Sequence, residues 1–556
     1  MFCYHCQEAK KNRVCDQTGI CGKSSDLSSL QDLLVFSLKG LAFYAVQARQ
    51  CGMVDEKTDQ FTVRALYATI TNVNFDPSDF VWMIKEAVQR RNRLRRSIAS
   101  ENPQHDIPAD SLPEAAQWQY GNATEQEFIE KGASICFQVP PEEIADSVAL
   151  QETLLYGVKG LSALLSHAAA LDAAIDPNFH TFIQEALLFG LQGEVTEDDA
   201  LARVLACGEQ GLAAMALLEQ ANTGRFGHPT PTRVYLDVWD KPAILVSGND
   251  LRDLEELLEQ TDGTGVDVYT HGEMIAAHAY PALRKHPHLV GNYGNTWFEQ
   301  RIDFAKFNGP ILVTTNSIQQ QKATYKDRIF TTGMVGWPGI PHIQDRKPGQ
   351  QKNFQALIEM ARQCQPPTLL EEGSLSIGYA RNTLSEMLDR IVAALQSGAV
   401  KRLIVLAGGD GRHKERRYYT QLAEALPADT VILTAGDAKF RFLKLDLGEI
   451  DGIPRILDAG QSHDIHSLIV FLQQLQQAMG VDHINDLPVS FDLAWYEQKT
   501  LIALLALLSL DIKNIRFGPT LPPFFTENIK NLLAEKFALK GIDSPEADVA
   551  AMLAGS

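Results

Sequence analysis

The first 220 residues place apolar side chains three or four positions apart, which is the spacing of amphipathic helices. One such stripe consists of Leu27, Leu30, Leu34, Leu38 and Leu41. The pattern recurs about 120 positions later, where Lys159-Gly160-Leu161 matches Lys39-Gly40-Leu41. We therefore predict two related helical bundles, at about 25–100 and 145–220, joined by a polar stretch at 101–122.

After Gly224 the pattern changes to short apolar runs, each followed by a turn and then by helical periodicity. This alternation is typical of parallel sheets built from βα units. The predicted strands are 243–247, 266–270, 311–315, 403–407, 431–434, 455–457 and 515–517. The predicted fold class is thus multidomain α and α/β, with a helical domain at 1–222 followed by parallel α/β domains at 223–367 and 368–556.

Composition and charge narrow the classes of partner. The 556 residues are 45% hydrophobic, which is enough to fill several cores. A net charge of -19 repels phosphate backbones and anionic lipids, so we expect neither nucleic acid nor a membrane surface as a partner. The longest apolar run, 501–510, is shorter than the roughly 20 residues of a membrane span. Met1 and Phe2 lead directly into Cys3 without a signal peptide, and we expect a cytoplasmic protein.

Half of the eight cysteines lie within the first 21 residues, in the spacing C-x2-C-x8-C-x5-C. A C-x2-C pair places two thiolates on one metal centre, and the other two lie on a glycine-bearing loop that can wrap back. An iron–sulfur centre on Cys3, Cys6, Cys15 and Cys21 is the favoured interpretation, with zinc, disulfides and free thiols as alternatives. We expect His5, between the first two cysteines, to face solvent.

Polar residues follow most of the predicted strands. In open parallel sheets, binding sites form where the carboxyl ends of the strands meet the loops. Taken singly, each of these residues is better explained as a helix cap or a turn former; together they predict one polar pocket. The residues are Asn249, Asp250, His271, Glu273, Ser317, Asp410, Asp437, Ser462 and His463, with Glu497 and Lys499 at the start of the helix that leads into 501–510.

Several motifs are spread along the whole chain. They are the cysteine quartet, Asn-Val-Asn-Phe at 72–75, Thr-His-Gly-Glu-Met at 270–274, Val-Gly-Asn-Tyr-Gly at 290–294, Leu-Asp-Ala-Gly-Gln at 457–461 and Trp-Tyr-Glu-Gln-Lys at 495–499. With them the chain resembles the hybrid cluster proteins, also called hydroxylamine reductases or prismane proteins. The resemblance implies a helical domain followed by two Rossmann-like domains, and a 4Fe-4S cubane on the N-terminal cysteines.

In the hybrid cluster proteins a second, iron–sulfur–oxygen cluster is held by one histidine, two glutamates and four cysteines. The resemblance places the two glutamates at Glu273 and Glu497 and a neighbouring lysine at Lys499. The other positions differ, with Asn249 in place of the histidine and Ser317, Gly409, Asp437 and Ser462 in place of the cysteines. Bridging sulfides need soft thiolate ligands, so we do not expect the usual hybrid cluster or assign hydroxylamine or nitric oxide reduction from the resemblance alone.

Two functional hypotheses follow, and a third alternative is that the substitutions were engineered. In the first, the chain is an oxidoreductase whose altered second site binds non-sulfur iron or manganese and reduces a small nitrogen or oxygen species. Its metal ligands would be Asn249, Glu273, Ser317, Asp437, Ser462 and Glu497, with Glu273, Glu497 and Lys499 as the catalytic residues. In the second hypothesis the second site is empty, and the chain is a non-catalytic electron carrier, sensor or structural partner. Both include a redox partner protein, and family analogy suggests a homodimer.

Overall fold

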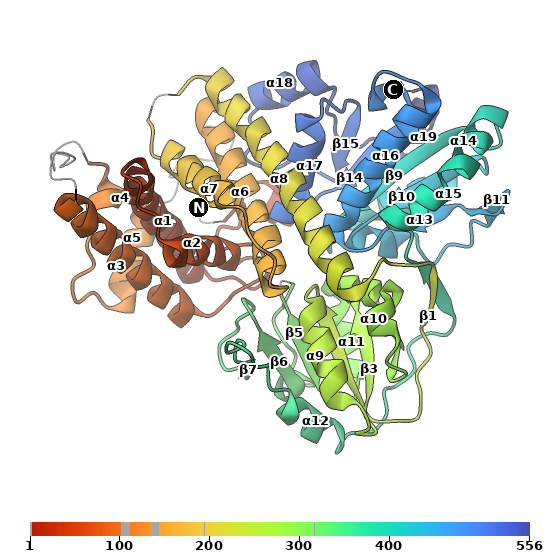
Figure 1. Ribbon diagram of the computed structural model, residues 1–556, viewed down its shortest axis with the longest axis horizontal. Coiled ribbons are helices and arrows are strands. Elements are labelled where there is room, and N and C mark those ends of the chain that lie inside the picture. The colour runs from red at the N-terminus through yellow and green to blue at the C-terminus, as the bar shows by residue number, and fades with distance from the viewer. Residues whose placement is uncertain (1–2, 102–111, 136–143, 194, 316, 556) are drawn as a thin grey trace.

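The computed structural model describes residues 3–101, 112–135, 144–193, 195–315 and 317–555. A helical N-terminal part, coloured red to yellow in Figure 1, lies beside two parallel sheets that are flanked by helices. This arrangement confirms the predicted fold class of a helical part followed by α/β units.

The helical part repeats a unit of three helices among the described residues. Corresponding helices begin about 120 residues apart, the offset at which the sequence pattern recurs. The first unit is α1 (Ser25–Gln50), α2 (Glu56–Ala68) and α3 (Pro77–Glu101), and the second is α6 (Asp146–Ala170), α7 (Pro177–Phe189) and α8 (Glu197–Phe226). The short helices α4 (Glu114–Gln117) and α5 (Glu125–Ile135) lie between them in sequence.

Two of these helices, α1 and α8, have the length and apolar composition of a membrane span. The core helices of soluble proteins meet the same criterion. The apolar stripe predicted for α1 is buried here, and Leu30, Leu34 and Leu38 have no exposed surface. These side chains belong to the main hydrophobic core, so in this structure they pack against protein.

In the described part of the chain the first sheet contains eight strands, in the order β7-β6-β5-β2-β3-β4-β1-β8. All neighbours are parallel except β1 and β8. The strands are β1 (Thr232–Tyr235), β2 (Ala243–Gly248), β3 (Asp267–His271), β4 (Leu289–Asn292), β5 (Ile311–Thr314), β6 (Ile329–Thr332), β7 (His342–Ile343) and β8 (Ser374–Ile377), and the helices among them are α9 (Leu251–Thr261), α10 (Pro281–Arg284), α11 (Gln300–Lys306) and α12 (Gln355–Ala361). Because β8 pairs with β1, the sheet extends past the division expected at 367.

The second sheet is entirely parallel and, over the described residues, has five strands in the order β13-β10-β9-β14-β15. Its strands are β9 (Arg402–Gly408), β10 (Thr430–Thr434), β13 (Ile456–Asp458), β14 (Val489–Ala494) and β15 (Ile515–Gly518), and β11 (Glu449–Ile450) and β12 (Ile453–Pro454) form a separate small ladder. The helices of this part are α13 (Arg381–Glu386), α14 (Leu388–Ser397), α15 (Arg417–Ala425), α16 (Ile465–Met479), α17 (Gln498–Ser509), α18 (Glu527–Phe537) and α19 (Pro545–Ala554).

Helix α17 joins this α/β part to the helical part, because it packs against both α6 and α8. The apolar run of α17 is buried from Leu501 to Leu508. The contact is close: a Cβ added at Gly208 of α8 would lie 2.0 Å from the backbone oxygen of Leu505. The start of α17, which carries Glu497 and Lys499, is therefore fixed between the two parts of the molecule.

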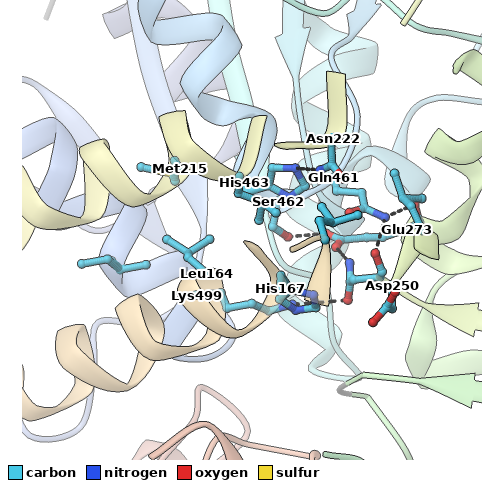
Figure 2. A pocket seen from close by; sticks show the side chains of 15 residues that line it. Leu164, His167, Met215, Asn222, Asp250, Glu273, Gln461, Ser462, His463 and Lys499 are labelled. Carbon is cyan, nitrogen blue, oxygen red and sulfur yellow. Dashed lines mark hydrogen bonds between the residues drawn. The ribbon is translucent and has the colours of Figure 1, made fainter. Parts of the chain in front are cut away.

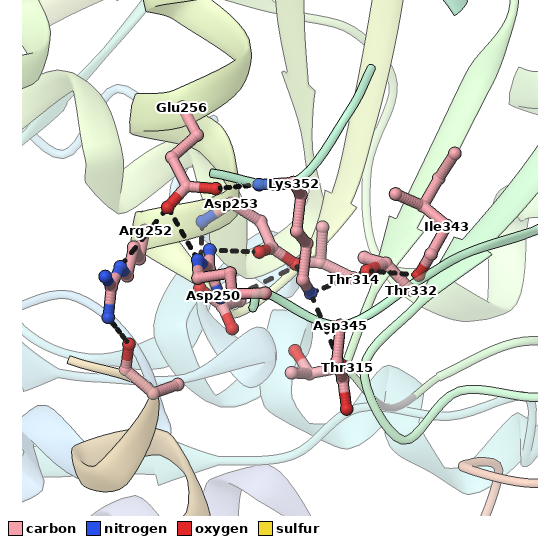
Figure 3. A network of polar contacts seen from close by, with 12 residues as sticks. Asp250, Arg252, Asp253, Glu256, Thr314, Thr315, Thr332, Ile343, Asp345 and Lys352 are labelled. Atoms are coloured by element: carbon pink, nitrogen blue, oxygen red, sulfur yellow. Dashed lines mark hydrogen bonds and ion pairs between the residues drawn. The ribbon is translucent and has the colours of Figure 1, made fainter. Parts of the chain in front are cut away.

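A network of buried charges fixes the loop that follows β2 (Figure 3). Asp250 caps α9 by accepting a hydrogen bond from the backbone N–H of Asp253 at 3.0 Å. The carboxylate of Asp253 pairs with the ammonium group of Lys352, also at 3.0 Å, and Lys352 donates to the hydroxyl of Thr332 at the end of β6. The network holds the loop that carries Asn249 against the neighbouring strands.

The buried Asp492 in β14 predicts a pH dependence of stability. The hydroxyl of Tyr418 lies 2.8 Å from carboxyl oxygens of both Asp492 and Asp548, and its one proton cannot serve both acids. Burial raises the pKa of Asp492 to about 7. Since the folded state holds this proton more tightly than the unfolded state, the stabilisation is complete below about pH 4 and is lost as the pH rises towards about 7.

Asp492→Asn should flatten this dependence, because the amide donates to Tyr418 as the protonated carboxyl does. We expect the free energy of unfolding above neutral pH to rise by up to a few kcal/mol, at about 1.4 kcal/mol per pKa unit. Urea unfolding monitored by circular dichroism at a series of pH values measures this free energy. Equal pH slopes in the variant and the wild type would contradict the assignment to Asp492.

Candidate redox centres

The four N-terminal cysteines lie together in one loop. Cys3 and Cys15 pair through their backbones, with N-to-O distances of 3.3 and 2.7 Å in the two directions. Cys3, Cys6 and Cys15 are buried and Cys21 is half-buried, and within the described residues none of the four is in a disulfide. The thiols are close enough for each to influence the pKa of its neighbours: Cys21, Cys3 and Cys15 all add to the effect of burial in raising the pKa of Cys6.

A buried lysine lies beside this quartet. The ammonium nitrogen of Lys23 is 3.9 Å from Sγ of Cys3 and donates to the side-chain oxygen of Gln31 at 2.5 Å. Burial raises the pKa of the Cys3 and Cys21 thiols, and Lys23 is the largest influence that lowers it. A neighbouring cation favours the thiolate, which is the form that binds metal. The arrangement therefore suits a metal centre that carries negative charge.

The loop is anchored to the second α/β part. The backbone N–H of Gln7 donates to the carbonyl of Tyr496 at 3.0 Å, and the carboxylate of Glu8 pairs with Arg412 at 2.8 Å. Cys6 itself packs in a small cluster with Trp297 and Tyr496. The cysteine loop thus contacts the residue directly before Glu497.

The expectation that His5 faces solvent is wrong. Its side chain is only 7% exposed and meets the ring of Tyr156 edge-on, with centroids 5.5 Å apart. Its backbone oxygen accepts a hydrogen bond from the side chain of Gln498 at 3.2 Å. His5 is therefore enclosed between the loop and the helical part because the loop packs against both.

The second candidate centre is a pocket at the strand ends, where Figure 2 shows Glu273, Ser462 and Lys499 around a common space. Asn249 follows β2, Glu273 follows β3, Ser462 follows β13 and Lys499 lies in the first turn of α17. The cavity measures about 20 Å³, which is room for about one water. Its other lining residues include His167, Asn222, His463, Leu164, Met215, Leu218 and Ile502.

Glu273 is the centre of the hydrogen bonds in this pocket. Its two carboxylate oxygens accept from the amide of Asn249 and from the hydroxyl of Ser462. The ammonium nitrogen of Lys499 lies 3.5 Å from the side-chain oxygen of Asn249. Burial raises the pKa of Glu273, but Lys499, the Ser462 hydroxyl, Lys439 and the Asn249 amide together outweigh it and leave the pKa below its ordinary value. Glu273 is therefore the ionised carboxylate of the pocket.

Two further acids, Asp437 and Glu497, have pKa values above rather than below the ordinary value. Burial, then Glu273, raises the pKa of Asp437 well above its ordinary value, and its Oδ1 atom is buried without a hydrogen-bond partner. Glu497 caps α17 by accepting from the backbone N–H of Lys499 at 2.9 Å, and burial raises its pKa also. Burial therefore disfavours a negative charge on both acids, in contrast to Glu273.

Asp437 and Glu497 lie near Glu273, which raises the pKa of both, but neither lines the cavity. Ser317 does not line it either. Its backbone oxygen accepts from the side chain of Gln300 at 2.5 Å. Thr315, two positions earlier, accepts instead from the backbone N–H of Asn249 at 2.9 Å. In the described part of the chain, no three His, Cys, Asp or Glu side chains lie close enough to hold a single metal ion.

The structure adds two residues that the sequence did not predict. His167 in the last turn of α6 and Asn222 in α8 line the pocket from the helical part. Burial, then Lys499, lowers the pKa of His167 to about 3, and Asn222 lies 3.1 Å from Nε2 of His463. Neither follows a strand, and Asn222 lies among other polar residues of α8, so the strand-end pattern does not indicate them.

Residues 1–550 of the chain match the family model described as the Prismane/CO dehydrogenase family. The chain belongs to this family. Among curated relatives, proteins named hydroxylamine reductase are 50% identical in Halothermothrix orenii and 47% in Nitratidesulfovibrio vulgaris, covering 100% of both chains in each case. The one from Caldanaerobacter subterraneus is 48% identical over 99% of this chain and 98% of its own.

Membership of the Prismane/CO dehydrogenase family confirms the resemblance found in the motifs, and with it an iron–sulfur redox protein. Among solved structures, carbon monoxide dehydrogenase IV from Carboxydothermus hydrogenoformans is similar with a TM-score of 0.56 and 15% identity, covering 100% of this chain and 92% of that one. At this identity the likeness shows a shared fold.

Proposed function

We propose that this chain is an iron–sulfur oxidoreductase in which Cys3, Cys6, Cys15 and Cys21 would hold a 4Fe-4S cubane that would supply electrons for a second, sulfur-free site. The cubane is favoured over zinc because the chain belongs to the Prismane/CO dehydrogenase family and its four free N-terminal cysteines lie together in one loop. The relatives named hydroxylamine reductase support a reductive activity. A redox partner protein in the cytoplasm would supply the electrons.

The observation that carries this proposal is the contact between the two centres through Tyr496. The ring of Tyr496 packs with Cys6, and its backbone oxygen accepts from Gln7. The next residue along the chain is Glu497, which we assign to the second site. The packing of Cys6 against Tyr496, followed by the peptide bond from Tyr496 to Glu497, thus connects the proposed cubane to the proposed second site.

At the second site, we infer that the oxygen-rich residues bind iron or manganese. Carboxylate, amide and hydroxyl oxygens suit hard metal ions better than an iron–sulfur cluster. The buried Oδ1 of Asp437, close to the negative Glu273, has no partner that would compensate it in the described structure. A bound cation would supply that compensation, and Lys499 lies within reach as a proton donor to a small nitrogen or oxygen species. The ligands would be Asn249, Glu273, Asp437, Ser462 and Glu497.

A second candidate function has its own support. Both oxygens of Glu273 already accept hydrogen bonds, Lys499 supplies a positive charge, and Glu497 caps a helix. The retained carboxylates therefore have structural roles that need no metal. With an empty second site the chain would be a one-cluster electron carrier, sensor or structural partner.

Metal analysis of anaerobically purified protein, combined with electron paramagnetic resonance, separates the two functions. For the oxidoreductase we expect a reducible cubane and metal beyond its four irons. Asp437→Ala should remove only the additional metal, because it deletes one hard ligand and leaves the cysteine loop unchanged. The control Asp492→Asn, which changes a buried acid outside the pocket, should keep the full metal content.

Four irons with a single cubane signal in the wild type would support the one-cluster function. An unchanged metal content in Asp437→Ala, alongside additional metal in the wild type, would show that this metal is bound elsewhere. Absence of an iron–sulfur signal from anaerobically prepared protein would overturn both functions.

A further inference from the structure

A larger cavity, of about 270 Å³, lies between the two helical repeats and beside the cysteine loop. One water needs roughly 10–15 Å³ of such space, and small-molecule sites begin near about 300 Å³. The cavity therefore has room for a small molecule. Its polar lining consists of Asp32 and Lys39 from α1, Glu152 and Lys159 from α6, and Tyr4, His5 and Tyr156.

The charged residues of this cavity are duplicated by the repeat. Asp32 and Lys39 in α1 correspond to Glu152 and Lys159 in α6, about 120 positions later. In each helix the acid and the lysine are seven residues apart, which places them on one face about two turns from each other. Each repeat therefore presents one carboxylate and one ammonium group to the same space.

The opposite charges face each other across the repeats. Burial raises the pKa of Asp32 to about 7, and Lys159 is the largest influence that lowers it. Burial also raises the pKa of Glu152, and there the main opposing influence is Lys39. The two acids and the two lysines thus influence one another across the repeats, although no ion pair joins them within the described residues, and the cavity is lined by two acidic and two basic side chains.

Several polar groups of this lining have no partner within the described residues. Lys159 is 2% exposed and makes neither a hydrogen bond nor an ion pair, although its ammonium group lies 5.5 Å from the ring centre of Tyr156. Asp32 likewise makes no hydrogen bond or ion pair there. The hydroxyl of Tyr156 and Nδ1 of His5 are buried without a hydrogen-bond partner. Buried polar groups are nearly always satisfied, so this lining is suited to a polar occupant.

We propose that this cavity binds a small zwitterionic molecule of the amino acid type, whose carboxylate lies against Lys159 and Lys39 and whose ammonium group lies against Asp32 and Glu152. The two acids and two lysines of the lining sum to zero charge. A purely anionic ligand would face two carboxylates and a purely cationic one would face two ammonium groups, whereas a zwitterion matches both. The orphaned hydroxyl of Tyr156 is placed to bind it as well.

Isothermal titration calorimetry at neutral pH tests the proposal on the full-length, iron-loaded protein. The probes are glycine, 4-aminobutyrate and 6-aminohexanoate, compared with the singly charged butyrate and butylamine. We expect saturable binding of at least one zwitterion, with both singly charged probes weaker by about tenfold or more. Lys159→Met and Asp32→Asn should each weaken that binding about 10- to 100-fold, the effect of losing one charge-assisted hydrogen bond. The surface variant Lys530→Met should bind as the wild type does.

Failure of every zwitterion to bind the folded wild type would overturn the proposal. Binding as tight as that of the wild type in both Lys159→Met and Asp32→Asn would also overturn it. Circular dichroism and the iron content check that each variant is folded. If one variant does not fold, the other variant and the preference of the wild type for zwitterions over singly charged probes decide the matter. The result is independent of the second redox centre, which these variants do not touch.

Discussion

Cys6→Ala is expected to abolish the iron–sulfur cluster. A cubane on this loop needs all four thiolates, and Cys6 is the ligand that packs against Trp297 and Tyr496 at the contact with the second α/β part. Its buried position leaves no route for water to replace the lost ligand readily. We expect the iron and acid-labile sulfide content to fall by a full cluster, together with loss of the signal that reduction produces in electron paramagnetic resonance.

Cys364→Ala is the matched control for this substitution. Cys364 is half-buried, follows α12, and its thiol donates to the carbonyl of Met360 at 3.2 Å, far along the chain from the quartet. This variant should keep its iron and sulfide. Full iron content in Cys6→Ala would refute the ligand assignment, and zinc without labile sulfide in the wild type would refute the cubane itself.

The strands show which part of the fold the sequence encodes locally. The strands β2, β5, β9 and β10 are continuous apolar runs, and the sequence predicts all of them. The strand β14, between β9 and β15, escaped prediction because Ser490 and Asp492 interrupt its apolar pattern. Both are hydrogen-bonded to residues far away in sequence, Ser490 to Arg402 and Asp492 to Tyr418, each at 2.8 Å. Such pairing exists only after folding, so no local pattern reveals it.

The second candidate site likewise combines residues that the sequence predicts with residues that only the folded structure brings in. The rule that loops at the carboxyl ends of parallel strands form one site predicts the meeting of Asn249, Glu273 and Ser462, and the structure brings them together. Ser317 follows β5 but does not reach the cavity, since Thr315 occupies the place next to Asn249. His167 and Asn222 come from helices of the other part of the molecule. Their contribution depends on how α17 packs against α6 and α8. This packing cannot be predicted from the residues that follow the strands.

A fully buried ion pair, between Lys439 and Asp458, lies near Glu273 of the second site. Lys439 has no exposed surface and donates to both carboxylate oxygens of Asp458, at 3.0 and 2.9 Å, and to the carbonyl of Gly460 at 2.8 Å. It also lowers the pKa of Glu273 and Asp437, although burial and other neighbours act more strongly on both. Removing its charge therefore leaves Asp458 unpaired and makes the pocket more negative.

Lys439→Met is accordingly expected to lower the free energy of unfolding by about 3–5 kcal/mol, the usual cost of breaking a buried ion pair from one side. Lys401→Met, which removes an exposed lysine paired with Asp429 at the start of the same sheet, should cost less than about 1 kcal/mol. Denaturant unfolding measures both. Adding Asp458→Asn to Lys439→Met removes the unpaired charge, so the double variant should be more stable than Lys439→Met alone. Equal decreases in the free energy of unfolding of Lys439→Met and Lys401→Met would mean that packing rather than charge stabilises this region. A double variant no more stable than Lys439→Met would mean the same.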